Sequence, residues 1–190
     1  MQNYLYIGLL FLAICCTTVP DKKEEVPAIP KSNTENYNPE AKVAELGITL
    51  GSPSDPVANY VNVVRTGNLL FLSGKGPLQN NGENITGKLG VDLTIEQGYE
   101  AAKITAINQL SVLKANLGNL NKVKRVIKVL GMVNAHPDFT DHPAIINGYS
   151  DLMVAVFGEK GKHARAAVGM GSLPGNIAVE IEMIVEVEAE

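Results

Sequence analysis

The segment 177–187, near the end of the chain, alternates between apolar and acidic side chains. A β-strand turns successive side chains to opposite faces of its sheet, so this two-residue period predicts a strand with one face on the core. The apolar face would carry Val179, Ile181, Met183, Val185 and Val187. The opposite face would carry Glu180, Glu182, Glu186 and Glu188. The chain is therefore expected to build a sheet that other elements cover on one side.

The rest of the sequence supplies elements that would complete such a sheet. Two β-rich runs, 60–65 and 69–73, flank a Thr-Gly-Asn turn, which predicts a hairpin. Thr94 and Gln97 have the spacing of a capping box, and they open a helical pattern that stops at Gly118. The sequence then predicts a strand at 123–134, a helix at 143–157, and strands at 165–170 and 177–187. The order ββαβαββ predicts an α+β fold, a mixed sheet with two helices on one face.

The cysteine, histidine and charge content limit the chemistry that this fold could support. Cys15 and Cys16 lie in the N-terminal segment, so no disulfide, thiolate nucleophile or cysteine-bound metal is expected in the folded part. His136 and His142 flank a loop that could chelate a metal, but two ordinary surface histidines are the simpler interpretation; His163 stands apart from both. The net charge of −4 is unlike the basic surface of a nucleic-acid-binding protein. We expect no metal, no cofactor and no nucleic-acid partner.

The first 45 residues predict export and tethering. Residues 1–16 contain an apolar run that is shorter than the ~20 residues needed to span a bilayer, as in the core of a secretion signal. The stretch 12–16 resembles a bacterial lipobox in which Cys15 or Cys16 would be lipidated; a plain cleaved signal and an uncleaved anchor are the alternatives. Residues 17–45, rich in proline and polar side chains, predict a flexible linker. A folded domain at 46–190 would then belong to a periplasmic or membrane-anchored lipoprotein, or alternatively to a secreted protein.

Arg165 and Glu180 are the candidate site residues with the clearest chemical rationale. Alanine or glycine occupies positions 164, 166, 167 and 169, which would leave open space beside the Arg165 guanidinium. A guanidinium is a planar, bidentate donor for a carboxylate, and Glu180 on the following strand could carry protons. A structural alternative fits these residues equally well: Arg165 would pair with Glu180 or Glu182 across neighbouring strands.

Several short motifs occur in a fixed order along the chain. They are Tyr60, Gly67-Asn68, Ser73-Gly-Lys-Gly-Pro77, Gly98-Tyr-Glu-Ala-Ala102, Gly131-Met-Val-Asn134, Asn147-Gly-Tyr-Ser-Asp151, the run from Phe157 to Arg165, Leu173-Pro174 and Glu180-Ile-Glu182. Together they resemble the YjgF/Rid (reactive intermediate deaminase) family, and more narrowly its subgroup labelled chorismate-mutase-like endoribonuclease L-PSP. The resemblance covers roughly residues 46–188, almost all of the expected folded region.

The resemblance implies a chorismate-mutase-like fold and a homotrimer with a cleft at each subunit interface. Active members of the family hydrolyse reactive enamines and imines, such as 2-aminoacrylate, to a 2-keto acid and ammonia. By position, Arg165 would bind the carboxylate of this small-molecule substrate, and Glu180 would position or activate water and move protons. The substrate cleft would be lined by Tyr60, Ser73, Gly74, Asn147 and Ala167.

Three positions depart from the family pattern. Ala167 stands where the best-known members carry a cysteine, Lys75 where a glutamine is frequent, and Gly169 where a glutamate is common. These departures leave a non-catalytic, ligand-binding trimer as the alternative to a deaminase. An endoribonuclease ranks lower, because an acidic chain with a small cleft fits RNA poorly.

Overall fold

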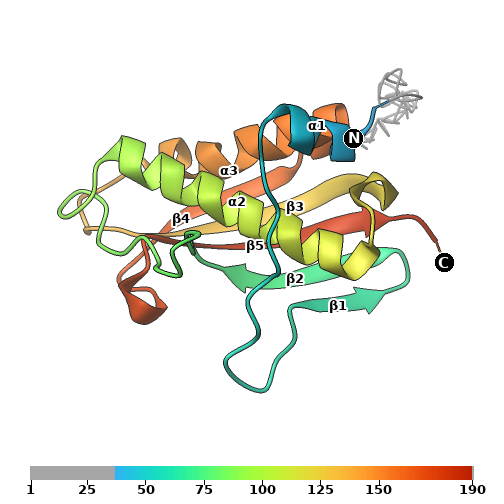
Figure 1. The fold of residues 1–190 in the computed structure, drawn as a ribbon. Coiled ribbons are helices and arrows are strands. Elements are labelled where there is room, and N and C mark those ends of the chain that lie inside the picture. Colours follow the sequence, from blue (N-terminus) through green and yellow to red (C-terminus); the bar gives the residue numbers. More distant parts are fainter. Residues whose placement is uncertain (1–36, 190) are drawn as a thin grey trace, which may run out of the picture. The chain divides into compact units, whose positions relative to one another are not determined.

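The computed structural model describes residues 37–189. A single mixed sheet has the strand order β1-β2-β5-β3-β4, and helices α2 and α3 lie side by side over one of its faces (Figure 1). The elements are α1 (Pro39–Glu45), β1 (Val63–Thr66), β2 (Leu69–Lys75), α2 (Ile95–Leu117), η1 (Leu120–Lys122), β3 (Val123–Asn134), α3 (His142–Phe157), η2 (Gly158–Gly161), β4 (Ala164–Met170), η3 (Pro174–Asn176) and β5 (Val179–Val187).

The predicted α+β architecture is confirmed: the chain forms a mixed sheet with two helices on one face. All strand pairs are antiparallel except β3 with β4, which are parallel. The helix α3 forms the crossover between these two parallel strands, as such a connection requires. Because β5 pairs with both β2 and β3, it lies at the centre of the sheet and β4 lies at one edge.

Two strands begin later than the sequence predicted. β1 begins at Val63 rather than at residue 60, since its pairing with β2 runs only from Val63 to Thr66. The Asn62 side chain before it is bonded to Ser54 and Lys75. β5 begins at Val179, because the residues before it form the short η3 turn and Ile177 makes only an isolated bridge with Thr86.

The core lies between the sheet and the two long helices. The predicted capping box at the start of α2 is present: Gln97 N donates to Thr94 Oγ1, and Thr94 N donates to Gln97 Oε1. Gly118 ends α2 in the left-handed conformation, with φ of 72°. The apolar face predicted for the last strand is buried on the helix side; its five residues are Val179, Ile181, Met183, Val185 and Val187. Burying each such side chain stabilises the fold by roughly 1.5–3 kcal/mol.

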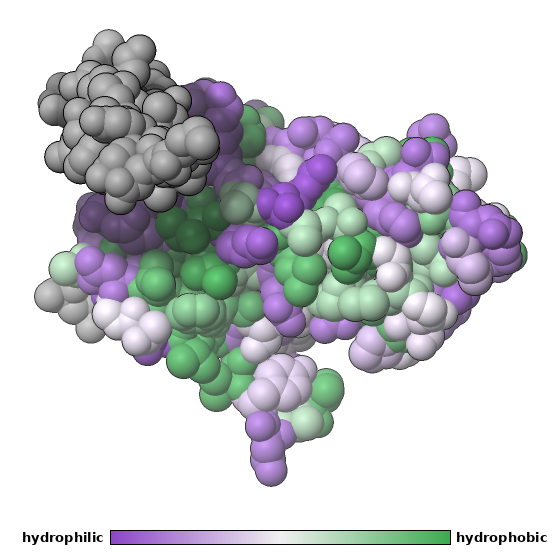
Figure 2. Space-filling model, turned by 180° about the vertical axis from the view of Figure 1, so that it is seen from behind, coloured by the Kyte–Doolittle hydropathy of each residue, from purple (hydrophilic) through white to green (hydrophobic). Residues whose placement is uncertain are grey.

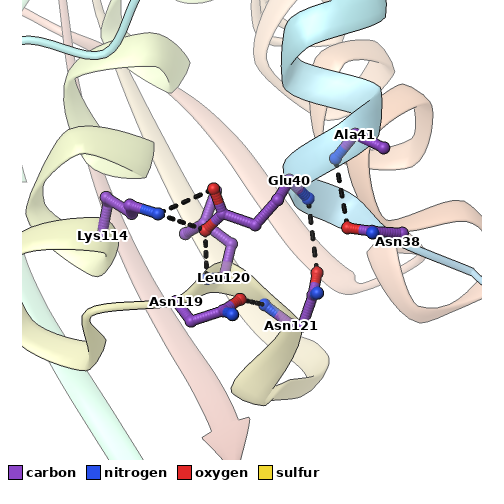
Figure 3. Close-up of polar contacts among 7 residues, drawn as sticks. All are labelled: Asn38, Glu40, Ala41, Lys114, Asn119, Leu120 and Asn121. Atoms are coloured by element: carbon purple, nitrogen blue, oxygen red, sulfur yellow. Dashed lines mark hydrogen bonds and ion pairs between the residues drawn. The ribbon is translucent and has the colours of Figure 1, made fainter.

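The last part of the predicted linker is folded. The helix α1 lies within residues 17–45, and the Glu40 carboxylate at its start accepts hydrogen bonds from Lys114 Nζ and from Leu120 N, each at 2.7 Å (Figure 3). Asn121 Oδ1 accepts from Glu40 N at 3.3 Å. Burial raises the pKa of Glu40, but these donors outweigh it and the net pKa lies below the ordinary value. The folded part therefore begins before the predicted boundary at residue 46.

The predicted signal or lipoprotein segment 1–16, and residues 17–36 of the predicted linker, lie outside the described residues. Within residues 37–189, no helix combines the length and the apolar character needed to cross a membrane.

Candidate functional site

The two predicted catalytic residues lie on opposite faces of the sheet. Arg165 on β4 is in register with Val129, a buried residue that faces the helices. Glu180 on β5 is in register with Met132 and precedes Ile181, which is buried against the helices, so Glu180 points to the uncovered face. β3 also separates the two strands. The structural alternative from the sequence was a pair of Arg165 with Glu180 or Glu182 across neighbouring strands. It is wrong for a single chain, because Glu182 lies on the same strand and the same face as Glu180.

Arg165 is held by α3. Its Nη1 donates to Asn147 Oδ1 at 2.9 Å and to Ser150 Oγ at 3.0 Å. Both acceptors are neutral, and no carboxylate within residues 37–189 forms an ion pair with this guanidinium. The predicted residue Asn147 thus lies beside Arg165, together with Ser150, which was not among the predicted site residues. We call Arg165, Asn147, Ser150 and His163 the Arg165 cluster.

The same face of β4 carries two of the predicted departures. Ala167 is half-buried and packs against the core, in register with Gly131. Gly169 lies against the ring of His142, the first residue of α3. The two are so close that a Cβ at position 169 would collide with that ring. The absence of larger side chains at 167 and 169 therefore leaves room beside the edge strand, part of which His142 fills.

Glu180 lies against the backbone of β2. The register between β2 and β5 shifts between Leu72 and Lys75, which marks a β-bulge. At Gly74, inside this bulge, a Cβ would collide with the Glu180 carboxylate, so only glycine permits this approach. Burial raises the pKa of Glu180, and the negative charge of Glu182 raises it further. A raised pKa moves a carboxyl towards the range in which general acid–base groups work.

Gln109 of α2 donates hydrogen bonds to both strands at the bulge. It was not among the predicted site residues. Its Nε2 donates to Ser73 O at 3.0 Å and to Ile181 O at 2.9 Å, on the two strands that the bulge separates. The side chain is fully buried, and its Oε1 has no hydrogen-bond partner among the described residues. The signal in the sequence is a polar residue on the apolar stripe of α2, one position before the core residue Leu110.

A cleft of about 710 Å³ opens beside the bulge. We call it the Gly74 cleft; its wall includes the loop 52–57, Tyr60, residues 74–76, Asn84, Thr86, Asn108 and residues 174–175. Of the predicted cleft residues, Tyr60 and Gly74 line it, and Tyr60 is 46% exposed. Ser73 does not line the cleft; its hydroxyl donates a hydrogen bond to Val61 O at 2.7 Å, which links β2 to the segment after Tyr60.

Lys75 forms part of this cleft wall and is only 9% exposed. Its ammonium donates to Asn62 Oδ1 at 2.7 Å, to Ser54 Oγ at 3.1 Å and to Ser54 O at 3.2 Å. Burial lowers the pKa of Lys75, while the nearby Asp55 opposes that shift. Lys75 therefore ties the segment before β1 to the end of β2.

The uncovered face of the sheet is partly apolar. Figure 2, viewed from behind, shows hydrophobic surface over the region of β1 and β2. There Val64 is 55% exposed and Phe71 41% exposed. A shallow hollow of about 260 Å³ on this face is lined by both residues together with Leu130 and Ile184. The charged residues Lys128 and Glu182 also line this hollow, so the face is mixed in polarity.

The described residues contain no group of three or more histidine, cysteine or acidic side chains arranged to hold a metal ion. His136 lies near Asp138, with Nδ1 3.6 Å from Oδ2, while His142 packs edge-on against Phe139. The two histidines thus have separate surroundings.

The α+β architecture, two helices over one face of a mixed sheet, is that of a chorismate-mutase-like protein. The family described as "YjgF/chorismate mutase-like, putative endoribonuclease" matches residues 40–187, and the chain belongs to this family.

Three relatives illustrate the range of similarity. Protein TCP17 of Trypanosoma cruzi is 44% identical over 147 residues, which cover 77% of this chain and 92% of that protein. A 2-iminobutanoate/2-iminopropanoate deaminase of Dermatophagoides farinae is 31% identical over 134 residues, covering 70% of this chain and 89% of the relative. The crystal structure of the protein Atu1372 from Agrobacterium tumefaciens is 45% identical with a TM-score of 0.74, covering 79% of this chain and 92% of that one.

Proposed function

We propose that the protein is a hydrolytic deaminase of small imines and enamines that carry a carboxylate. The observation that carries this proposal is the half-buried Glu180 carboxyl, which lies against Gly74, a residue that lines an open cleft, and has a raised pKa. A guanidinium without an anionic partner among the described residues, Arg165, supplies a matching carboxylate binder elsewhere on the same chain. The activity of the mite relative supports the same reaction class.

In this proposal the active site is shared between copies of the chain. Arg165 lies on the edge strand β4, whereas the Gly74 cleft lies beyond the other side of β5. One chain therefore cannot place both groups on one small substrate. A homotrimer in which β4 of one copy approaches the Gly74 cleft of the next would complete the site three times, and it would cover the apolar face around Phe71.

The proposed chemistry is the addition of water to a C=N bond. Ionised Glu180 accepts a proton from water as the water oxygen bonds to the imine carbon. The protonated Glu180 then returns that proton to the nitrogen, which gives a carbinolamine with a hydroxyl and an amino group on the same carbon. Glu180 next takes the hydroxyl proton and passes it to the amino group, so that the C–N bond breaks, ammonia leaves and the oxygen becomes the keto group. Arg165 of a neighbouring copy would hold the substrate carboxylate throughout, which fixes the reacting carbon in position. No cofactor is needed for this balance.

The test is the release of 2-keto acid from imines that an amino-acid oxidase generates in the presence of the full-length chain. The proposal expects the imine to disappear faster with the chain present than in buffer alone. Unchanged imine decay with binding of a keto acid would favour the non-catalytic alternative. Cleavage of single-stranded RNA without any effect on imines would favour the endoribonuclease that the family description mentions.

We expect Phe71→Glu to convert the assembly from three chains to one. Phe71 lies on the uncovered face of β2, in register with Ile184 of β5, and a buried unpaired carboxylate there would oppose association. The measurement is the mass in solution by sedimentation or light scattering. Val91→Glu, which alters an exposed turn residue, serves as the control and should leave the mass at three chains. A wild-type mass of one chain would contradict the shared site.

A further inference from the structure

Arg165 is the end of a chain of hydrogen bonds that runs back through α3 to the η2 turn. Arg165 Nη1 donates to Ser150 Oγ at 3.0 Å. Ser150 Oγ lies 3.1 Å from His163 Nε2, and His163 Nδ1 lies 2.6 Å from the carbonyl oxygen of Gly161. The side chain of His163 is partly buried between these groups.

Only one arrangement of protons satisfies these contacts with a neutral ring. The Gly161 carbonyl can only accept, so His163 Nδ1 must carry a proton. In the neutral imidazole, Nε2 is then an acceptor, and the Ser150 hydroxyl must donate to it. The lone pairs of Ser150 Oγ are thereby left for Arg165. If the ring were protonated, His163 Nε2 and Arg165 Nη1 would both donate to Ser150 Oγ. The hydroxyl hydrogen of Ser150 would then need a different acceptor.

The surroundings of His163 favour the neutral ring. Burial lowers the pKa of His163, and the positive charge of Arg165 lowers it further, against an opposing effect of the Gly161 carbonyl. That carbonyl is held firmly, because Gly161 is buried and packs so closely on α3 that a Cβ would collide with the Met153 carbonyl. Both ends of the chain of hydrogen bonds are therefore fixed to the fold.

The acceptors also decide which side of the guanidinium faces a ligand. Nη1 carries two N–H donors, and Asn147 and Ser150 accept one each. Among the residues described, none accepts a hydrogen bond from Nε or Nη2 of Arg165. Nε–H and the neighbouring Nη2–H point the same way and form a two-pronged donor that matches a carboxylate.

We propose that Ser150 and His163 are positioning residues that fix the Arg165 guanidinium so that its Nε–Nη2 side receives the substrate carboxylate. This inference rests on the proposed role of Arg165 as the carboxylate-binding residue. Ser150 and His163 touch no reacting atom; they act through Arg165.

The first test observes the ring directly in the full-length chain labelled with ¹⁵N-histidine. The His163 signals, identified by their loss in His163→Gln, should report the Nδ1–H tautomer and a titration below the ordinary histidine pKa of about 6.5. Ser150→Ala and Arg165→Ala should each raise that pKa, since the first removes the donor to the neutral ring and the second removes a like charge. An Nε2–H tautomer, or a titration that neither variant moves, would overturn the inference.

The second test measures the binding of pyruvate, a keto-acid probe, by NMR titration. Ser150→Ala should weaken pyruvate binding by about tenfold, the effect of one hydrogen bond to a charged group. Ser150→Thr keeps the hydroxyl and should bind within about twofold of the wild type. His163→Phe should resemble Ser150→Ala, whereas His163→Gln, which keeps a neutral acceptor, should bind more tightly than His163→Phe.

Thr105→Val is the matched control, since it removes another helix hydroxyl, one that is bonded to Ala101 O at 2.9 Å and not to Arg165. It should leave pyruvate affinity unchanged. Equal weakening by Ser150→Ala and Ser150→Thr, or none by either, would overturn the inference. The tautomer measurement needs no ligand. It therefore tests the chain of hydrogen bonds from Arg165 to Gly161 even if pyruvate binds weakly. Absence of imine hydrolysis, with the expected tautomer and pyruvate affinities, would instead contradict the proposed deaminase alone.

Discussion

Arg165→Ala should lower kcat/KM for carboxylate-bearing imines by about 30- to 150-fold, because the charge-assisted pair that it would form with the substrate contributes about 2–3 kcal/mol. Arg165→Lys should recover little of this loss, since an ammonium is a point charge and cannot reproduce the bidentate fork. The measurement is keto-acid release at limiting substrate.

The fold should survive both substitutions. Arg165 lies on an edge strand and its described partners are the neutral side chains of Asn147 and Ser150, so no buried countercharge is left behind. The melting temperature is therefore the control for each variant. Turnover at the wild-type rate by a well-folded Arg165→Ala assembly would end the catalytic assignment and favour a binding protein.

Glu180→Gln should lower kcat by about 10²- to 10⁴-fold, the usual contribution of a general acid–base group. The amide keeps the size and the hydrogen bonding of the side chain but cannot take a proton from water. Substrate binding should change little, so KM should remain close to that of the wild type.

The proposed role of Glu180 also predicts how kcat depends on pH. Burial and then Glu182 raise the pKa of Glu180 above its ordinary value. The ionised form, which the proposed first step needs, is therefore lost at a higher pH than for an ordinary carboxyl as the solution is acidified. Wild-type kcat should fall on the acid side with a midpoint above about 4.3, the ordinary glutamate value. The residual activity of Glu180→Gln should lack this fall; an identical acid limb in both proteins would show that another group is responsible.

The periodic parts of the fold could be predicted from sequence, because their signals are local. The alternation around Val179 and Val185 identified the buried face of the central strand, and Thr94 with Gly118 set the ends of α2. The helix α1 was assigned to a linker, because its stability comes from contacts of Glu40 with residues about 80 positions further along. Composition carries no record of such distant partners.

The candidate site was predicted as residues but not as an arrangement. Consecutive elements are usually adjacent, yet β3 lies between β4 and β5 and separates Arg165 from Glu180. The registers of these strands also place the two side chains on different faces. Gln109 and Ser150 were missed for a related reason. Each is a single polar residue on a helix, and its role is set by backbone and side-chain groups that only the folded chain brings near.

The shared active site is the central claim, and complementation between two inactive variants tests it most directly. Arg165→Ala and Glu180→Gln chains are co-assembled at equal amounts, and keto-acid release is compared with that of each variant alone. In randomly mixed trimers, about one quarter of the sites would combine an intact Arg165 from one copy with an intact Glu180 from the next. We predict that the mixture recovers roughly that fraction of wild-type activity. Recovery no greater than the average of the two separate variants, in trimers shown to be mixed, would contradict a site shared between copies.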